Sequence, residues 1–145
     1  MVPGEVFEQI ACVDSTENPG WLVNKATGET NFSSVELQEI LEEHVTQVVQ
    51  HYGRRAYCWD VVNEAIYDGE NVSQFLKPSA PWYPAVPGYI DAAFIAARKA
   101  DPHVKLFYNE YSAEGLNAKS GEHLLNRQSL AGLQSLTVSF GHPAE

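Results

Sequence analysis

The sequence predicts an α/β fold organised around a parallel sheet. Two short apolar runs, 56–62 and 104–108, each stop abruptly at polar residues, as strands buried on both faces do. Helical periodicity separates the runs, giving the order strand, helix, strand, helix, strand, helix, strand. This order is typical of parallel strands joined by right-handed crossovers. It does not distinguish a barrel from a doubly wound sheet.

The first part of the chain contains a short strand and the clearest helix. Residues 9–13 (Gln-Ile-Ala-Cys-Val) fit a strand. Ser33 and Glu36 form the capping-box pattern that begins a helix over 33–52. Gly53 then suits a left-handed helix end. The helix carries a stripe of apolar side chains at steps of three and four, which predicts its buried face: Leu37, Leu41, Val45, Val48 and Tyr52.

The second part of the chain repeats the alternation. The strand over 56–62 is followed by a segment rich in proline and aromatic residues, and then by a helix over 87–100. A second buried strand follows over 104–108. A short polar helix over 118–130 and a last strand over 133–140 complete the pattern. We treat the 145 residues as one domain.

Composition and charge narrow the range of partners. The formal net charge is −10 and no Lys/Arg cluster occurs, which argues against nucleic acid and anionic membranes. An acidic surface with exposed aromatic residues is compatible with neutral polymers such as polysaccharides. Cys12 and Cys58 lie far apart, each in an apolar run, and this favours two buried thiols over a disulfide or a zinc site. The N-terminal residues show no signal-peptide pattern, and no apolar run approaches the roughly 18 residues of a membrane span.

Glu64 is the main candidate for chemistry. It follows Asn63 at the C-terminal end of the first buried strand, where the βα loops of α/β folds build active sites. A carboxyl group there suits general acid catalysis, and the alternative is a solvated glutamate at a strand end. Glu110 ends the next strand between Asn109 and Tyr111, and side-chain alternation is expected to turn it away from the site.

Other catalytic patterns do not occur in the sequence. The five histidines are scattered and form no H-E-x-x-H motif, and no serine lies in G-x-S-x-G. The dinucleotide pattern G-x-G-x-x-G and the phosphate-loop pattern are also missing. We therefore expect neither a cofactor nor a metal.

Residues 59–65 (Trp-Asp-Val-Val-Asn-Glu-Ala) resemble the acid/base motif of glycoside hydrolase family 10, the endo-β-1,4-xylanases. The resemblance extends from roughly residue 11 to residue 140 and implies a (β/α)₈ barrel, of which this chain would hold about strands three to six. It is carried by further segments on both sides of the motif: 19–21 (Pro-Gly-Trp), 43–46 (Glu-His-Val-Thr), 89–91 (Tyr-Ile-Asp), 100–102 (Ala-Asp-Pro), 105–111, 114–120 and 132–135 (Gly-Leu-Gln-Ser).

The resemblance also implies roles for individual residues. Glu64 would protonate the leaving oxygen and then act as base in a retaining mechanism, and Asn63 would hold the 2-hydroxyl of the sugar at the cleaved bond. Gln134 would lie near the acid/base, while Trp21 and Tyr111 would help to line the cleft. The substrate would be xylan or a xylo-oligosaccharide, and the family is usually extracellular.

The chain departs from the family pattern in ways that bear on activity. The family's nucleophile is a glutamate on the seventh strand, which this chain does not contain, and the first two strands are also missing. Asp14-Ser15 replaces a Trp-His pair, and Leu136 replaces a histidine that contacts the nucleophile. A full barrel typically needs about 250 residues. We therefore expect an incomplete catalytic domain, marginally stable and with little or no activity by itself. The alternatives are a non-catalytic oligosaccharide-binding remnant and another retaining β-glycanase of barrel fold.

Overall fold

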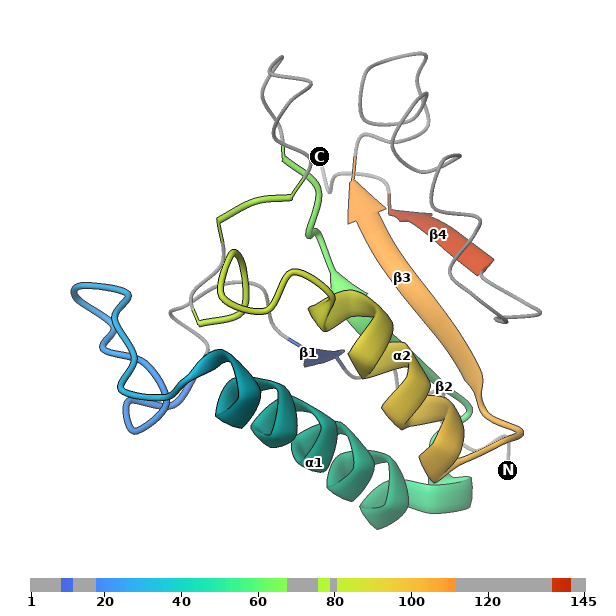
Figure 1. Cartoon of the computed structure of the whole chain (residues 1–145). Helices are drawn as coiled ribbons and strands as arrows, with labels where there is room; N and C mark the ends of the chain where they lie inside the picture. The colour runs from blue at the N-terminus through green and yellow to red at the C-terminus, as the bar shows by residue number, and fades with distance from the viewer. Residues whose placement is uncertain (1–8, 12–17, 68–75, 79–80, 112–136, 142–145) are drawn as a thin grey trace.

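The structure is a four-stranded parallel sheet with two helices on one of its faces (Figure 1). The computed structural model describes residues 9–11, 18–67, 76–78, 81–111 and 137–141. The strands are β1 (Gln9–Ala11), β2 (Cys58–Asn63), β3 (Lys105–Tyr111) and β4 (Thr137–Gly141). The helices are α1 (Ser34–Tyr52) and α2 (Tyr89–Ala100), and a 3₁₀ turn, η1 (Gly53–Arg55), follows α1.

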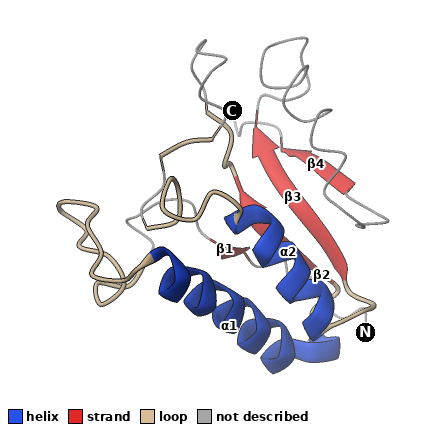
Figure 2. Ribbon diagram, viewed as in Figure 1, coloured by secondary structure: helices blue, strands red, loops and turns tan. Residues whose placement is uncertain are grey.

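The topology decides between the two architectures that the sequence left open. The strands lie in the order β1-β2-β3-β4, and every neighbouring pair is parallel. A doubly wound sheet reverses its strand order at a switch point and carries helices on both faces. Here the order follows the chain, and α1 and α2 lie on the same side of the sheet (Figure 2). The fold is therefore a partial (β/α)₈ barrel, which confirms the architecture that the family resemblance implied.

The start of α1 is fixed by the predicted capping box. The Ser33 hydroxyl accepts a hydrogen bond from the Glu36 amide at 3.3 Å, and the Glu36 carboxylate accepts one from the Ser33 amide at 2.8 Å. The helix buries Leu37, Leu41, Val45 and Val49. The predicted stripe missed Val49, which is fully buried, whereas Val48 and Tyr52 are partly buried and pack against the core.

Gly53 ends α1 with a positive φ of 49°, as expected. Its ψ of −131° places it in the mirror-image extended region rather than in the left-handed helical region, and the chain turns directly into η1. A side chain would be strained in this conformation, which explains the use of glycine there.

The core lies between the helices and the sheet. Trp59 of β2 is fully buried and contacts Tyr52 of α1 edge-to-face, with ring centroids 5.4 Å apart. Phe94 of α2 and Leu106 of β3 belong to the same cluster. Cys58 is buried, as predicted, whereas Cys12 lies outside the described residues. Among the described helices, none is long and apolar enough to cross a membrane.

Several predicted boundaries shift in the structure. The strand expected over 104–108 is β3 (Lys105–Tyr111), which includes the polar residues that the apolar pattern had excluded. The last strand begins at Thr137 in β4 rather than at residue 133. The helix predicted over 118–130 lies outside the described residues.

Candidate active site at the ends of the second and third strands

The carboxyl ends of β2 and β3 meet side by side and bring polar side chains together. Asn63 pairs with Asn109 in the parallel register. The Asn63 Oδ1 accepts a hydrogen bond of 2.6 Å from Asn109 Nδ2. Both side chains are half-buried. The contact fixes the amide of Asn63 at the strand end.

A register shift in β2 decides which face carries Asn63. Asp60 pairs with Phe107 and Val62 pairs with Tyr108, so that Val61 is an extra residue between them. Strand side chains alternate between faces, and a regular strand would place residue 63 on the same face as residues 59 and 61. The extra residue reverses the alternation, as bulges near active sites commonly do. Asn63 therefore shares the face opposite the helices with Asp60.

Glu64 leaves the strand in an unusual backbone conformation. Its φ is 52°, and it is the only non-glycine residue with positive φ in the described part of the chain. Its amide donates a hydrogen bond of 2.8 Å to the Asn109 carbonyl. The side chain is half-buried, and within the described residues no hydrogen bond or ion pair holds its carboxylate.

Glu110 faces the helix side of the sheet, as the alternation predicted. Leu106, Tyr108 and Glu110 are buried while Phe107 and Asn109 are half-buried. The Glu110 Oε2 accepts hydrogen bonds from the Tyr108 hydroxyl at 2.7 Å and from the Ile66 amide at 3.1 Å. Glu110 is therefore engaged in the interior and does not form a carboxylate pair with Glu64.

Asp60 is the other carboxyl group of β2 on the face opposite the helices. Burial raises the pKa of its side chain above the ordinary aspartate value. It precedes Asn63 by three residues, which is roughly 10 Å along a strand. The face opposite the helices thus carries Asp60, Asn63 and Asn109 beside the half-buried Phe107.

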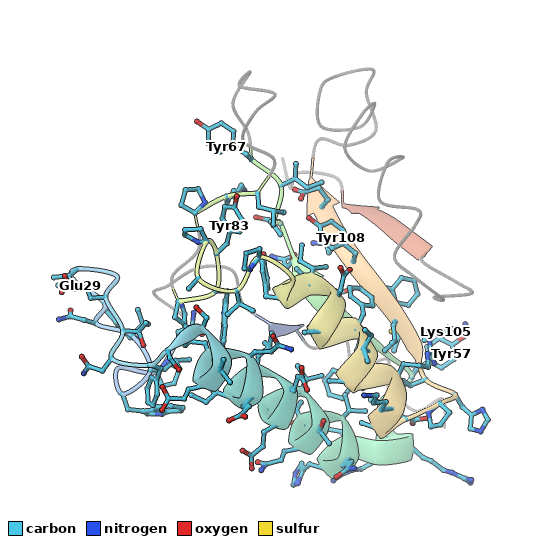
Figure 3. All side chains as sticks on the ribbon, viewed as in Figure 1. Glu29, Tyr57, Tyr67, Tyr83, Lys105 and Tyr108 are labelled. Carbon is cyan, nitrogen blue, oxygen red and sulfur yellow. The ribbon has the colours of Figure 1, made fainter. Side chains whose placement is uncertain are left out.

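Trp21 lies in a different part of the molecule. Its side chain is 66% exposed and contacts the Phe32 ring edge-to-face, with ring centroids 6.1 Å apart. It borders a hollow of about 380 Å³ lined by residues 20–25 and 29–31. Figure 3 shows Glu29, which lines the same hollow, on the loop that leads into α1 and well apart from Tyr108. The described residues of this hollow include neither Asn63 nor Glu64.

The remaining predicted site residues are only partly described. Tyr111 is the last residue of β3, next to the Glu110 position, but its side chain lies outside the described part of the structure. Gln134 also lies outside the described residues. The structure thus brings together Asn63 and Glu64 of the predicted set, and it adds Asn109, Tyr108 and Glu110. The polar ending of the 104–108 run was the sequence signal for Asn109 and Glu110, whereas Tyr108 lies inside the run and carried no such signal.

Comparisons with known proteins show which family the chain matches. Residues 10–133 match the family described as glycosyl hydrolase family 10. Endo-1,4-beta-xylanase B of Thermotoga neapolitana is 45% identical over 103 residues, which is 70% of this chain and 27% of that protein. The chain therefore spans only about a quarter of the length of that relative.

Solved structures of xylanases resemble this chain in fold. Native xylanase 10B of Thermotoga maritima superposes with a TM-score of 0.71 and 38% identity, covering 86% of this chain and 36% of that one. Xylanase 10B of Thermotoga petrophila RKU-1, solved in complex with xylobiose, gives a TM-score of 0.63 and 40% identity, covering 76% of this chain and 31% of that one.

Proposed function

Because the chain belongs to glycosyl hydrolase family 10, we propose that it supplies the acid/base part of a retaining endo-1,4-β-xylanase site. The observation that carries the proposal is Glu64, which directly follows Asn63 at the carboxyl end of a strand in a partial barrel. Active sites of (β/α)₈ barrels lie at this end of the strands. The matched part of this chain covers only 27% to 36% of the similar xylanases, so the activity proposed is that of a complete barrel.

Glu64 acts twice in the proposed mechanism. In the first step its carboxyl proton passes to the glycosidic oxygen as that oxygen leaves the anomeric carbon and a carboxylate nucleophile bonds to the carbon. In the second step Glu64 takes a proton from water, the water oxygen bonds to the anomeric carbon, and the bond to the nucleophile breaks. Both steps require a carboxyl group that can exchange its proton, and no described partner holds that of Glu64.

Neither of the other carboxyl groups on β2 and β3 fits the role of the nucleophile. A retaining pair needs carboxyl groups about 5–5.5 Å apart. Glu110 is buried on the helix side, and Asp60 lies three residues before Asn63 on the strand. Neither is suited to the role, so we infer that this chain by itself binds xylo-oligosaccharides without cleaving them.

The substrate contacts proposed are neutral hydrogen bonds and aromatic stacking. Asn63 is assigned to a hydroxyl of the sugar at the cleaved bond, and Gln134, which lies outside the described residues, is assigned a place near the acid/base by the family resemblance. Trp21 and Tyr111 provide flat apolar faces for sugar rings. Support comes from the xylobiose bound to the similar Thermotoga petrophila enzyme and from the exposure of Trp21.

Calorimetry with xylobiose and reducing-sugar release from xylan test the proposal. The wild-type chain should bind xylobiose, and Asn63→Ala should weaken binding about tenfold by removing a hydrogen bond of about 1.4 kcal/mol. Gln50→Ala, on the exposed side of α1, is the matched control and should bind like wild type. Sugar release should not exceed that of Glu64→Gln.

Each contrary result has a distinct meaning. Hydrolysis by the wild type that Glu64→Gln abolishes would support the role of Glu64 and contradict the inferred inactivity of the isolated chain. Release of other sugars from glucans but not from xylan would favour another retaining β-glycanase. A wild-type chain that takes up no xylobiose would contradict the substrate class.

A further inference from the structure

Three consecutive residues of β3 hold four consecutive residues at the end of β2. Asn109 contacts Asn63 through its side chain and Glu64 through its carbonyl. Tyr108 accepts a hydrogen bond of 3.0 Å from the Ala65 amide, and Glu110 accepts one of 3.1 Å from the Ile66 amide. The backbone ladder ends at Glu64, and side chains of β3 continue it for the next two residues.

The two side chains form one buried unit. Tyr108 is 6% exposed and Glu110 is fully buried. The Tyr108 hydroxyl donates its proton to Glu110 Oε2 at 2.7 Å while its oxygen accepts from Ala65. Burial and the charge of Glu110 raise the pKa of the Tyr108 phenol. The phenol therefore stays protonated and remains the donor of the hydrogen bond to Glu110. We name this unit, Tyr108 with Glu110, the buried clamp.

The buried clamp lies where the backbone is strained. A left-handed conformation costs a residue with a side chain roughly 1–2 kcal/mol, and it persists only where the surroundings enforce it. Glu64 adopts it at φ 52°. Without the clamp, two buried amides immediately after Glu64 would lose their acceptors, and the chain would relax to satisfy them. The antiparallel bridge of Ile66 with Leu76 fixes the other side of the same segment.

We propose that Tyr108 and Glu110 are positioning residues that hold Glu64 in its left-handed conformation and so aim its carboxyl group at the ligand. The role of this orientation in catalysis rests on the proposed function, whereas the effect of the clamp on the backbone conformation of Glu64 does not. Neither side chain contacts the ligand, because both lie on the helix face of the sheet.

Nuclear magnetic resonance tests the clamp without requiring activity. A positive φ gives a strong nuclear Overhauser effect between the amide and Cα protons of the same residue. Wild-type Glu64 should show this signal, and Tyr108→Phe should lose at least half of its intensity. The amides of Ala65 and Ile66 should exchange with solvent at least tenfold faster in Tyr108→Phe than in the control.

The control is Leu106→Val, on the same face of β3 and opposite Trp59 rather than Val62. It lowers stability through packing and should leave the Glu64 signal intact, which separates positioning from general stability. Glu110→Gln keeps the shape of the side chain and tests the clamp if Tyr108→Phe does not fold. The clamp also predicts that the Ala65 and Ile66 amides of the wild-type chain exchange slowly with solvent, and this measurement requires no variant.

The outcomes separate the clamp from the proposed function. A Glu64 signal that survives both clamp variants, or wild-type amides at 65 and 66 that exchange as in unprotected peptides, would overturn the clamp. Xylobiose should also shift the carboxyl-carbon resonance of Glu64, and at saturation at least twofold less in Tyr108→Phe. If xylobiose does not shift the wild-type Glu64 resonance while the Glu64 Overhauser signal still depends on Tyr108, the proposed function is overturned and the clamp is supported.

Discussion

Glu64 combines a proposed catalytic side chain with a strained backbone conformation. Its left-handed φ turns the chain sharply out of β2, while its amide remains bonded to Asn109. Strained conformations of this kind cluster at active sites because the surrounding structure holds the side chain in a geometry that it would not choose. At this residue, stability and function are therefore expected to oppose each other.

Replacing Glu64 by glycine should stabilise the fold. Relief of roughly 1–2 kcal/mol of left-handed strain outweighs the roughly 0.5–1 kcal/mol entropic cost of glycine, leaving a net gain of about 0.5–1 kcal/mol. Urea unfolding measures the change. Glu39→Gly, on the exposed face of α1, is the control and should lose about 1 kcal/mol. Equal losses in both variants would show that Glu64 is not strained.

The sequence identifies Asn63 and Glu64 as candidate site residues, but it does not show why their side chains are oriented as they are. The apolar run ending in a polar pair identified both residues. Simple alternation would have placed Asn63 on the helix face, and only the extra residue Val61 in β2 places it opposite the helices. The same alternation worked for Glu110, because β3 contains no register shift at that point.

Among the elements, α1 shows the closest agreement between sequence and structure. Its start depends on contacts between residues three positions apart, Ser33 and Glu36, which the sequence displays directly. The hydrogen bonds from Ser33, through its side chain and its backbone, lower the pKa of Glu36. A lowered pKa means that the ionised form stabilises the helix above the ordinary glutamate pKa, and that this stabilisation is lost as pH falls through the lowered value.

Ser33→Ala should destabilise the protein by about 1 kcal/mol at pH 7, because it removes the N-cap acceptor. The difference from wild type should shrink as pH falls below the Glu36 pKa, since protonation weakens the wild-type capping box as well. Thermal unfolding at several pH values measures this trend. Ser34→Ala, one residue further on and outside the cap, should change stability little at any pH, and a Ser33→Ala effect that grows toward low pH would contradict the argument.

At the scale of the whole molecule, one hydrophobic cluster joins both helices to the sheet. It includes Leu41 of α1, Phe94 of α2, Trp59 of β2 and Leu106 of β3. The helices cover only one face, and the opposite face of β2 and β3 presents Asp60, Asn63 and Asn109. Stability is therefore concentrated on the helix side, and the polar residues at the strand ends depend on it for their placement.

Leu41→Ala should destabilise the whole chain by about 2–5 kcal/mol, because it leaves a cavity in the shared cluster. Hydrogen exchange should accelerate in β2 and β3 as well as in α1, since all three share the core. Val35→Ala, at a position 68% exposed on the same helix, is the control and should change stability by no more than about 0.5 kcal/mol. Faster exchange confined to α1 would show that the elements unfold separately.

The sequence by itself determined the α/β class, the helix starting at Ser33 and the candidate pair Asn63 and Glu64, because periodicity, capping and strand ends are local patterns. The family resemblance already implied a partial barrel, and the strand order confirms it. Only the tertiary structure decided that Val61 is an extra residue and that Tyr108 and Glu110 support the backbone after Glu64. These features depend on which strands are neighbours and in what register. Contacts between residues more than 40 positions apart set that register, and no local pattern in the chain specifies it.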